Sequence, residues 1–174
     1  YGITVRWDKN FLTLIQIALT RRRLARFYGG VRFGGTVTIE DAWEMGFDHV
    51  AIAAGAGKPT IIDMKNNVMR GVRKASDFLM ALQLTGAFKR GALANLEVRL
   101  PAIIVGGGLT AIDSATELMA YYPVQVQKTL ERFTTLAREI GEERLWAQYN
   151  PEERERLAVY LEHGRAVASE RERA

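Results

Sequence analysis

The stretch IIVGGGLTAIDSATEL, residues 103–118, most constrains the fold because it joins an apolar run, three glycines and a helix-like pattern. Its glycines give the form G-x-G-x-x-A, from Gly106 through Gly108 to Ala111. Gly106 permits a sharp turn after a strand, and Gly108 lets a pyrophosphate approach backbone amides at a helix start. A small residue at Ala111 allows the helix to pack closely on the strand. The motif predicts a dinucleotide-binding turn or, alternatively, a tight structural connection.

The sequence around these glycines favours the dinucleotide interpretation. An apolar strand is expected over 102–105 and a helix over 109–120, which is the context that the fingerprint requires. The acid that usually follows about 20 residues later is absent. Gln125, Gln127 and Lys128 stand there instead, so Lys128 either contacts the 2′-phosphate of NADP or is a solvated lysine at a helix start. Asp113 is expected to stabilise the first helical turn rather than to act in catalysis.

Hydrophobic spacing and turn residues predict the other elements. Thr38 is a good cap for a short helix that Gly46 ends. Pro123 is expected either at the start of its strand or in a strand at the edge of a sheet. The expected elements are helices over 8–26, 38–46 and 72–87, and strands over 27–34, 49–56 and 121–127.

The last part of the chain has a different pattern. Apolar residues from Leu130 to Ile140 follow helical spacing, and Asn150 with Pro151 is a strong helix start. The final helix is expected to end near Glu162, followed by a frayed charged tail. Its many arginines and glutamates indicate a solvated helix face with internal ion pairs, or a tail that docks onto a partner.

Composition excludes several kinds of chemistry. The chain has no cysteine, which excludes a thiolate nucleophile, a redox disulfide and an iron–sulfur site within these residues. With only His49 and His163, we expect no metal site and read both histidines as surface or packing residues. No apolar run reaches the roughly 18 to 20 residues of a membrane span, so we expect no span and a cytoplasmic protein.

The net charge of +4 includes one cluster of arginines between positions 21 and 26, namely Arg21, Arg22, Arg23 and Arg26. We expect these cations to complement the C-terminal dipole of a helix and to stay solvated. The alternatives are contact with an anionic cofactor or partner and, least favoured, with nucleic acid. We expect no nucleic-acid partner.

Four pieces of the sequence occur in the order typical of one known family. They are YGI at 1–3, FGGTVTIEDAWEMGFDHVAIAAGAGKP at 33–59, GVRKASDFL at 71–79 and IIVGGGLTAIDSA at 103–115. Together they resemble the glutamate synthase small-subunit group of FAD-dependent pyridine nucleotide oxidoreductases, over residues 1–119. The resemblance implies a partial α/β fold, the Rossmann-like three-layer FAD/NAD(P)-binding fold, with a helical C-terminal segment.

The resemblance also implies domains and sites. Residues 1–70 would belong to the FAD-binding domain, 71–127 would begin the NAD(P)-binding domain, and 128–174 would be a helical extension or insertion. The FAD contacts would be Gly2, Ile3, Ala54, Gly55 and Ala56, although Ala54 to Ala56 also suit a strand end that needs small residues for packing. The pyridine nucleotide contacts would be Gly106, Gly107, Gly108, Leu109, Thr110 and Ala111. No catalytic acid or base is assigned.

The implied reaction is hydride transfer from NAD(P)H to FAD, followed by electron transfer to an acceptor protein or an iron–sulfur partner. The family's first FAD fingerprint is missing before Tyr1, so the chain is expected to be an internal piece of a larger flavoprotein and inactive alone. One alternative is a non-catalytic assembly or regulatory module with a partner-docking tail. Another is a different Rossmann-like protein, such as a short NADP-binding domain or a methyltransferase.

Overall fold

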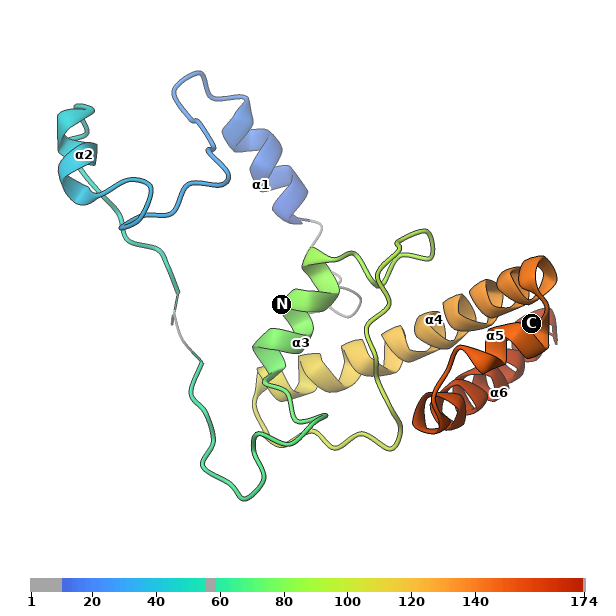
Figure 1. The fold of residues 1–174 in the computed structure, drawn as a ribbon. Coiled ribbons are helices and arrows are strands. Elements are labelled where there is room, and N and C mark those ends of the chain that lie inside the picture. The colour runs from blue at the N-terminus through green and yellow to red at the C-terminus, as the bar shows by residue number, and fades with distance from the viewer. Residues whose placement is uncertain (1–10, 56–58, 174) are drawn as a thin grey trace. The chain divides into compact units, whose positions relative to one another are not determined.

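The computed structural model describes residues 11–55 and 59–173, and its regular structure is helical (Figure 1). The helices are α1 (Phe11–Thr20), α2 (Ile39–Glu44), α3 (Ala75–Leu84), α4 (Leu109–Ile140), α5 (Glu142–Ala147) and α6 (Pro151–Arg173). No β-strand forms within the described ranges, where the only pairing is an isolated bridge between Phe33 and Val37. The expected α/β, Rossmann-like fold is therefore wrong, because a sheet needs strands that hydrogen-bond to one another.

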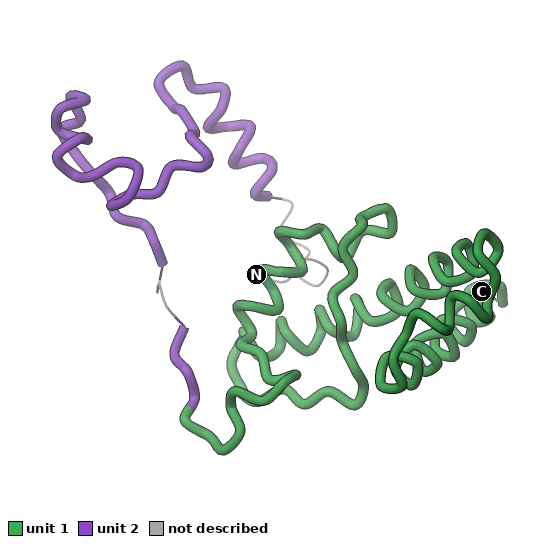
Figure 2. The backbone as a smooth tube through the Cα atoms, viewed as in Figure 1, with its two compact units in different colours: residues 1–7, 63–174 green, residues 8–62 purple. Residues whose placement is uncertain are grey.

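The chain divides into two units, residues 8–62 and residues 1–7 with 63–174 (Figure 2). The unit of residues 8–62 contains α1 and α2. The prediction of a helix after Asp8 is confirmed, but α1 ends at Thr20 rather than near residue 26. The helix at Thr38 is confirmed in detail: Thr38 and Asp41 form a capping box, and Gly46 follows the helix with a φ of 87°.

The strands expected in this unit and before the glycine turn are wrong. Residues 27–34 are irregular chain with turns at Gly29, Gly30 and Gly34. The described part of 49–56 is also irregular chain, in which Ile52 is 76% exposed. Residues 102–105 are likewise irregular, and the side chain of Ile103 is 89% exposed. Apolar, β-branched residues favour a strand only when a neighbouring strand accepts their backbone and side chains.

The unit of residues 63–174 is built on α4, against which α3, α5 and α6 pack (Figure 1). The helix expected over 72–87 is confirmed as α3, whose apolar face of Phe78, Leu79 and Leu82 is buried. Two apolar clusters form along α4. The first joins that face to Tyr121, Tyr122 and Val126, and the second joins Phe133 of α4 to Leu145, Leu157 and Leu161.

The strand predicted over 121–127 is wrong, because these residues lie in the middle of α4. The alternation of Val124 and Val126 with glutamines looked like a half-buried strand, but Tyr121 and Val126 point into one helical core. Pro123 has no N–H to donate within the helix, and α4 nevertheless continues through it. Packing on both sides of α4 outweighs the local preference.

The start of α6 is as predicted, and its end is not. The amide of Glu153 donates to Asn150 Oδ1 and the amide of Asn150 donates to Glu153 Oε2, each at 2.9 Å. The helix then continues to Arg173 instead of ending near Glu162, because its second half packs on α4. Gly164 allows a close approach of the two helices, since a Cβ at that position would lie 2.7 Å from the carbonyl oxygen of Val126.

Candidate functional site

The glycine turn has the local shape that the sequence predicts. Gly106 has a φ of 142°, which only glycine adopts readily, and a Cβ there would lie 3.2 Å from the Cβ of Ala111. Gly108 caps α4 without a side-chain hydrogen bond, so Leu109 and Thr110 occupy the first helical turn. Gly107 is exposed beside them. The turn and the helix start are present, but the strand that must precede them is absent from the described chain.

The residues expected to contact FAD are only partly described. Gly2, Ile3 and Ala56 lie outside the described residues. Ala54 and Gly55 are exposed in irregular chain, and Gly55 makes a turn with a φ of 71°. The predicted strand end at this position is therefore wrong, whereas FAD contact by these residues stays a prediction.

A row of polar side chains on α4 holds a neighbouring loop, residues 87–98, which we call the strap. Lys128 is only 1% exposed, and its Nζ donates to the carbonyl oxygens of Ala87 at 2.9 Å and Ala94 at 2.6 Å. Burial lowers the pKa of Lys128, and the charge of Arg132 lowers it further. Lys128 is thus not the solvated lysine that the sequence suggested. Its ammonium group is hydrogen-bonded to carbonyl oxygens of the strap and not directed to a 2′-phosphate.

Three more side chains of this row bind the strap backbone. Gln125 accepts from the amide of Val98 at 2.8 Å and donates to the same residue's carbonyl at 3.0 Å. Tyr121 donates to the carbonyl of Leu96, and burial raises the pKa of Tyr121 to about 12. Arg132 donates to the carbonyls of Ala92 and Leu93. The spacing 121, 125, 128, 132 is that of one helix face, a signal that a helical interpretation would have found.

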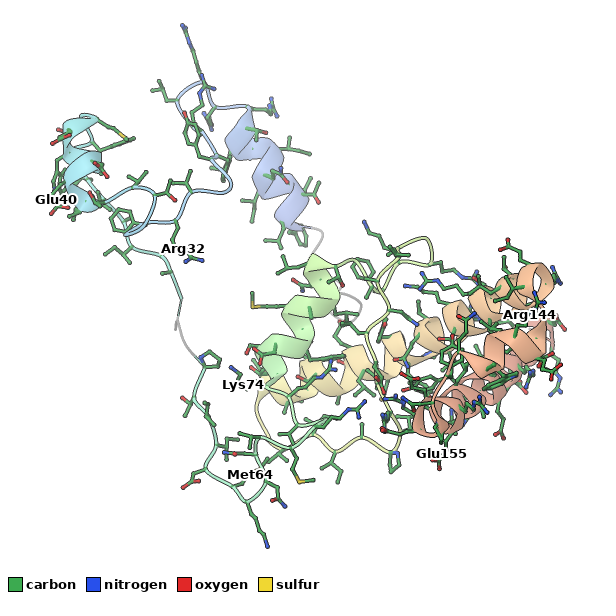
Figure 3. The ribbon with its side chains drawn as sticks, in the orientation of Figure 1. Arg32, Glu40, Met64, Lys74, Arg144 and Glu155 are labelled. Carbon is green, nitrogen blue, oxygen red and sulfur yellow. The ribbon has the colours of Figure 1, made fainter. Side chains whose placement is uncertain are left out.

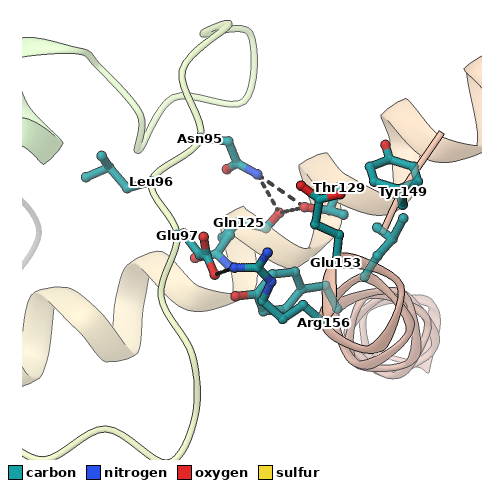
Figure 4. A pocket seen from close by; sticks show the side chains of 10 residues that line it. Asn95, Leu96, Glu97, Gln125, Thr129, Tyr149, Glu153 and Arg156 are labelled. Carbon is teal, nitrogen blue, oxygen red and sulfur yellow. Dashed lines mark hydrogen bonds and ion pairs between the residues drawn. The ribbon is translucent and has the colours of Figure 1, made fainter. Parts of the chain in front are cut away.

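A cleft of about 230 Å³ lies between the strap, α4 and α6 (Figure 4). Asn95 and Glu97 line it from the strap, Gln125 and Thr129 from α4, and Arg156 from α6. Asn95 Nδ2 lies 3.2 Å from Thr129 Oγ1, and Arg156 Nη1 lies 2.9 Å from Glu97 Oε1. The polar groups of the cleft are thus largely occupied by one another, which suits a structural junction.

Ion pairs extend from this cleft across the surface. Glu97 pairs with Arg99 at 2.8 Å as well as with Arg156, while Glu152 pairs with Arg70 at 3.2 Å and Arg99 at 3.3 Å. Burial alone would raise the pKa of Glu97, but the hydrogen bond from Arg99 and the charge of Arg156 together lower it. The hydrogen bond from Arg99 and the charge of Arg70 also lower the pKa of Glu152. The network fastens the strap to α6.

In the amino-terminal half of α4, residues 109–120, acidic side chains are buried and apolar side chains are exposed, which reverses the usual arrangement. Asp113, Ser114 and Glu117 are buried, and Glu117 is only 1% exposed. On another side of the same turns, Leu109, Ile112 and Met119 are exposed, Met119 by 72%. The positions 109, 112 and 119 share one helix face. We call these three residues the apolar face of α4. The prediction that Asp113 stabilises the first helical turn is wrong, because Asp113 is buried and lies beyond the first turn of α4, which contains no acid.

The described residues contain no group of three or more His, Cys, Asp or Glu side chains arranged to hold a metal ion. His163, one of the two histidines, packs between helices, with its Nδ1 2.6 Å from the hydroxyl of Tyr122. Across residues 11–55 and 59–173, no helix combines the length and the apolar composition that crossing a membrane requires.

Comparison with known proteins identifies a relative of this chain. The chain is 45% identical over 148 residues to the uncharacterized protein RP006 of Rickettsia prowazekii (strain Madrid E). The match covers 82% of this chain and 21% of that protein, so the chain spans about a fifth of the relative's length. No family model matches the sequence, and no solved structure is similar to it.

The membership expected from the sequence, in the glutamate synthase-like group of flavin-dependent oxidoreductases, is therefore wrong. The described residues form helices without a sheet, and the relative is uncharacterized. The predictions of a Rossmann architecture and of a flavoprotein are therefore wrong as well. Hydride transfer and the binding of FAD or NAD(P)H stay predictions from the sequence.

Proposed function

We propose that residues 63–173 form a non-catalytic assembly module, which docks onto a partner protein through the apolar face of α4. The observation that carries the proposal is the reversed polarity of residues 109–120. Exposed Leu109, Ile112 and Met119 lie beside buried Asp113 and Glu117. Single exposed apolar residues are ordinary, but a stripe of them on one helix face is typical of a binding surface.

The chemistry of this surface indicates what it binds. No charged residue occurs from Leu100 to Ile112, and the extended chain before the helix adds exposed Ile103 and Val105. Such a surface offers no cations for phosphate groups, which disfavours nucleic acid and anionic lipid. An amphipathic helix of this kind binds an apolar groove on another protein surface.

The rest of the unit supplies the rigid support that such a face needs. Helices α4 and α6 pack against each other, and Gly164 lets their backbones approach closely. Because the stripe of exposed apolar side chains lies on α4, we assign the docking surface to α4 rather than to the helical tail.

A photo-crosslinking experiment tests the proposal. Benzoylphenylalanine replaces Met119 in the protein expressed in its own cells, and Val159 of α6, another exposed apolar position, serves as the control. We expect one discrete heavier adduct from position 119, which disappears when Ile112→Asp is added, and none from position 159.

Two outcomes would overturn the assignment. Equal crosslinking from positions 119 and 159 would show that the apolar face has no specific partner. An adduct of twice the mass of the protein would show self-association instead of a different partner. Circular dichroism of each purified variant checks that α4 is still folded.

A further inference from the structure

We infer that α1 and the arginines that follow it form an interfacial anchor for an anionic lipid surface. This surface lies in the unit of residues 8–62 and is independent of the apolar face of α4. The inference rests on an unburied apolar helix, its charge pattern and the residues that come directly after it.

The first observation is that α1 is apolar and has no buried residue. Its large side chains are between 41% and 58% exposed, and they project outward from the ribbon (Figure 3). They are Phe11, Leu12, Leu14, Ile15, Ile17 and Leu19. Water contact with so much apolar area is unfavourable, so an apolar environment that accepts this helix stabilises the protein.

The second observation is the arrangement of polar groups on α1. Thr13, Gln16 and Thr20 follow the spacing i, i+3, i+7 and therefore form one narrow polar stripe. The remaining arc is apolar. A helix of 10 residues is about 15 Å long, too short to cross a bilayer but suited to lying in its interface with the polar stripe toward water.

The third observation is the charge of the segment. From residue 10 to residue 39 the sequence has five arginines and no acidic residue. Arg21, Arg22, Arg23 and Arg26 follow α1 directly, are exposed, and form no ion pair with any described residue. Phe27 and Tyr28 come next, both exposed, and aromatic residues favour the membrane–water interface.

The apolar arc of α1 and the arginines that follow it together favour one kind of binding partner, an anionic lipid surface. Cations near an anionic lipid surface add to the free energy that apolar insertion supplies. Nucleic acid would be attracted to the arginines but would leave the apolar arc of α1 in water. An apolar protein groove would cover the arc but would leave the arginines unpaired. A bilayer with anionic headgroups satisfies both.

Vesicle flotation of the purified full chain tests the inference. We expect binding to vesicles of phosphatidylcholine mixed with phosphatidylglycerol, little binding to phosphatidylcholine alone, and weaker binding as salt is raised. Equal binding to both vesicles, or no binding to either, would overturn the inference.

Two sets of variants separate charge from apolar insertion. The triple variant Arg21→Gln, Arg22→Gln, Arg23→Gln is expected to weaken binding to the mixed vesicles about a hundredfold, at about fivefold per arginine. The double variant Leu14→Ser, Ile15→Ser is expected to weaken it at least about tenfold. The matched control is Arg138→Gln, Arg144→Gln, Arg165→Gln, three exposed arginines that form no ion pair within the described chain, and it should bind like the wild type.

Results with the control variant and with an oligonucleotide could each contradict the lipid anchor. If it loses as much affinity as the first triple variant, the attraction depends on net charge alone and the anchor is wrong. If the chain binds a single-stranded oligonucleotide more tightly than the mixed vesicles, and Leu14→Ser, Ile15→Ser leaves both affinities unchanged, the arginines serve nucleic acid instead. Circular dichroism of each variant shows whether the helical content is retained.

Discussion

The two halves of α4 belong to one helix and have opposite relations to the rest of the molecule. From Tyr121 onward the helix is enclosed: its apolar residues meet α3, α5 and α6, and its polar row holds the strap. From Leu109 to Ala120 the helix buries acids and exposes apolar side chains. A single helix therefore combines a structural core with an exposed apolar surface.

The difference shows why helical content alone does not indicate what a segment does. In the carboxyl-terminal half, polar groups are buried because each meets a specific backbone partner, as Gln125 meets Val98. In the amino-terminal half, apolar groups are exposed without any such compensation in the described chain. Substitutions in the first region should change the free energy of unfolding, whereas substitutions in the second should change association.

The largest effect is expected in the apolar cluster between α4 and α6. Leu161 is 2% exposed and contacts the cluster around Phe133, so Leu161→Ala should lower the free energy of unfolding by about 2 to 5 kcal/mol. Urea denaturation followed by circular dichroism measures this change. Val159→Ala, at an exposed position of the same helix, should change it by less than about 0.5 kcal/mol.

The next effect concerns the attachment of the strap. Lys128→Met keeps an unbranched side chain up to the ε position but removes the ammonium group, which leaves the carbonyls of Ala87 and Ala94 without their donor. We expect a loss of about 1 to 3 kcal/mol and faster proteolysis within residues 87–98. Lys65→Met, at an exposed position, is the control. Unchanged protease resistance of Lys128→Met would contradict a role for this lysine in holding the strap.

A smaller effect is expected from the surface ion pairs. Glu97→Gln should lower the free energy of unfolding by up to about 1 kcal/mol at neutral pH, because the pairs with Arg99 and Arg156 are partly exposed. Glu155→Gln, an exposed position on α6, is the control.

The pH dependence of this effect has a definite sign. The pKa of Glu97 is lowered in the folded protein from an ordinary value of 4.5. Its stabilisation is therefore fully present above about pH 4.5 and is lost as the pH falls through the folded pKa. The melting temperature of the wild type should fall more steeply than that of Glu97→Gln on acidification below pH 4.5. Parallel curves would contradict this contribution.

The smallest effect on stability is expected in the amino-terminal half of α4. Ile112→Ser, at an exposed position on the apolar face, should change the free energy of unfolding by less than about 0.5 kcal/mol. It should nevertheless weaken crosslinking from position 119. A loss of several kcal/mol would show that this face belongs to the core and would remove the difference between the two halves.

Local signals in the sequence predicted where helices start better than they predicted where helices end or where strands form. The capping pairs at Thr38 and Asn150 were found because a cap depends on residues only three positions apart. The glycine turn at Gly106 was found for the same reason. The strands over 49–56 and 102–105 were not confirmed, since a strand depends on a neighbour distant in the sequence.

The candidate site could be predicted only in part. The family resemblance pointed to Gly106 to Ala111 as the candidate site. The apolar face of α4 and the strap contacts could be predicted only if residues 121–127 were known to be helical. Pro123 and the Val–Gln alternation pointed to a strand, and packing against α3 and α6 reversed that preference. Once the helix is assigned, the spacing of Tyr121, Gln125 and Lys128 becomes readable from the sequence.

Pro123 stands where the two halves of α4 meet, and this position has a consequence for motion. Because proline has no N–H, the carbonyl of Met119 lacks its helical donor, and the backbone ladder is interrupted at the boundary. We therefore expect the amides of the first three turns to exchange their hydrogens faster than those of the rest of the helix. If the apolar face docks onto a partner, as proposed, an interruption at Pro123 would let these turns change direction without loosening the bundle that supports them.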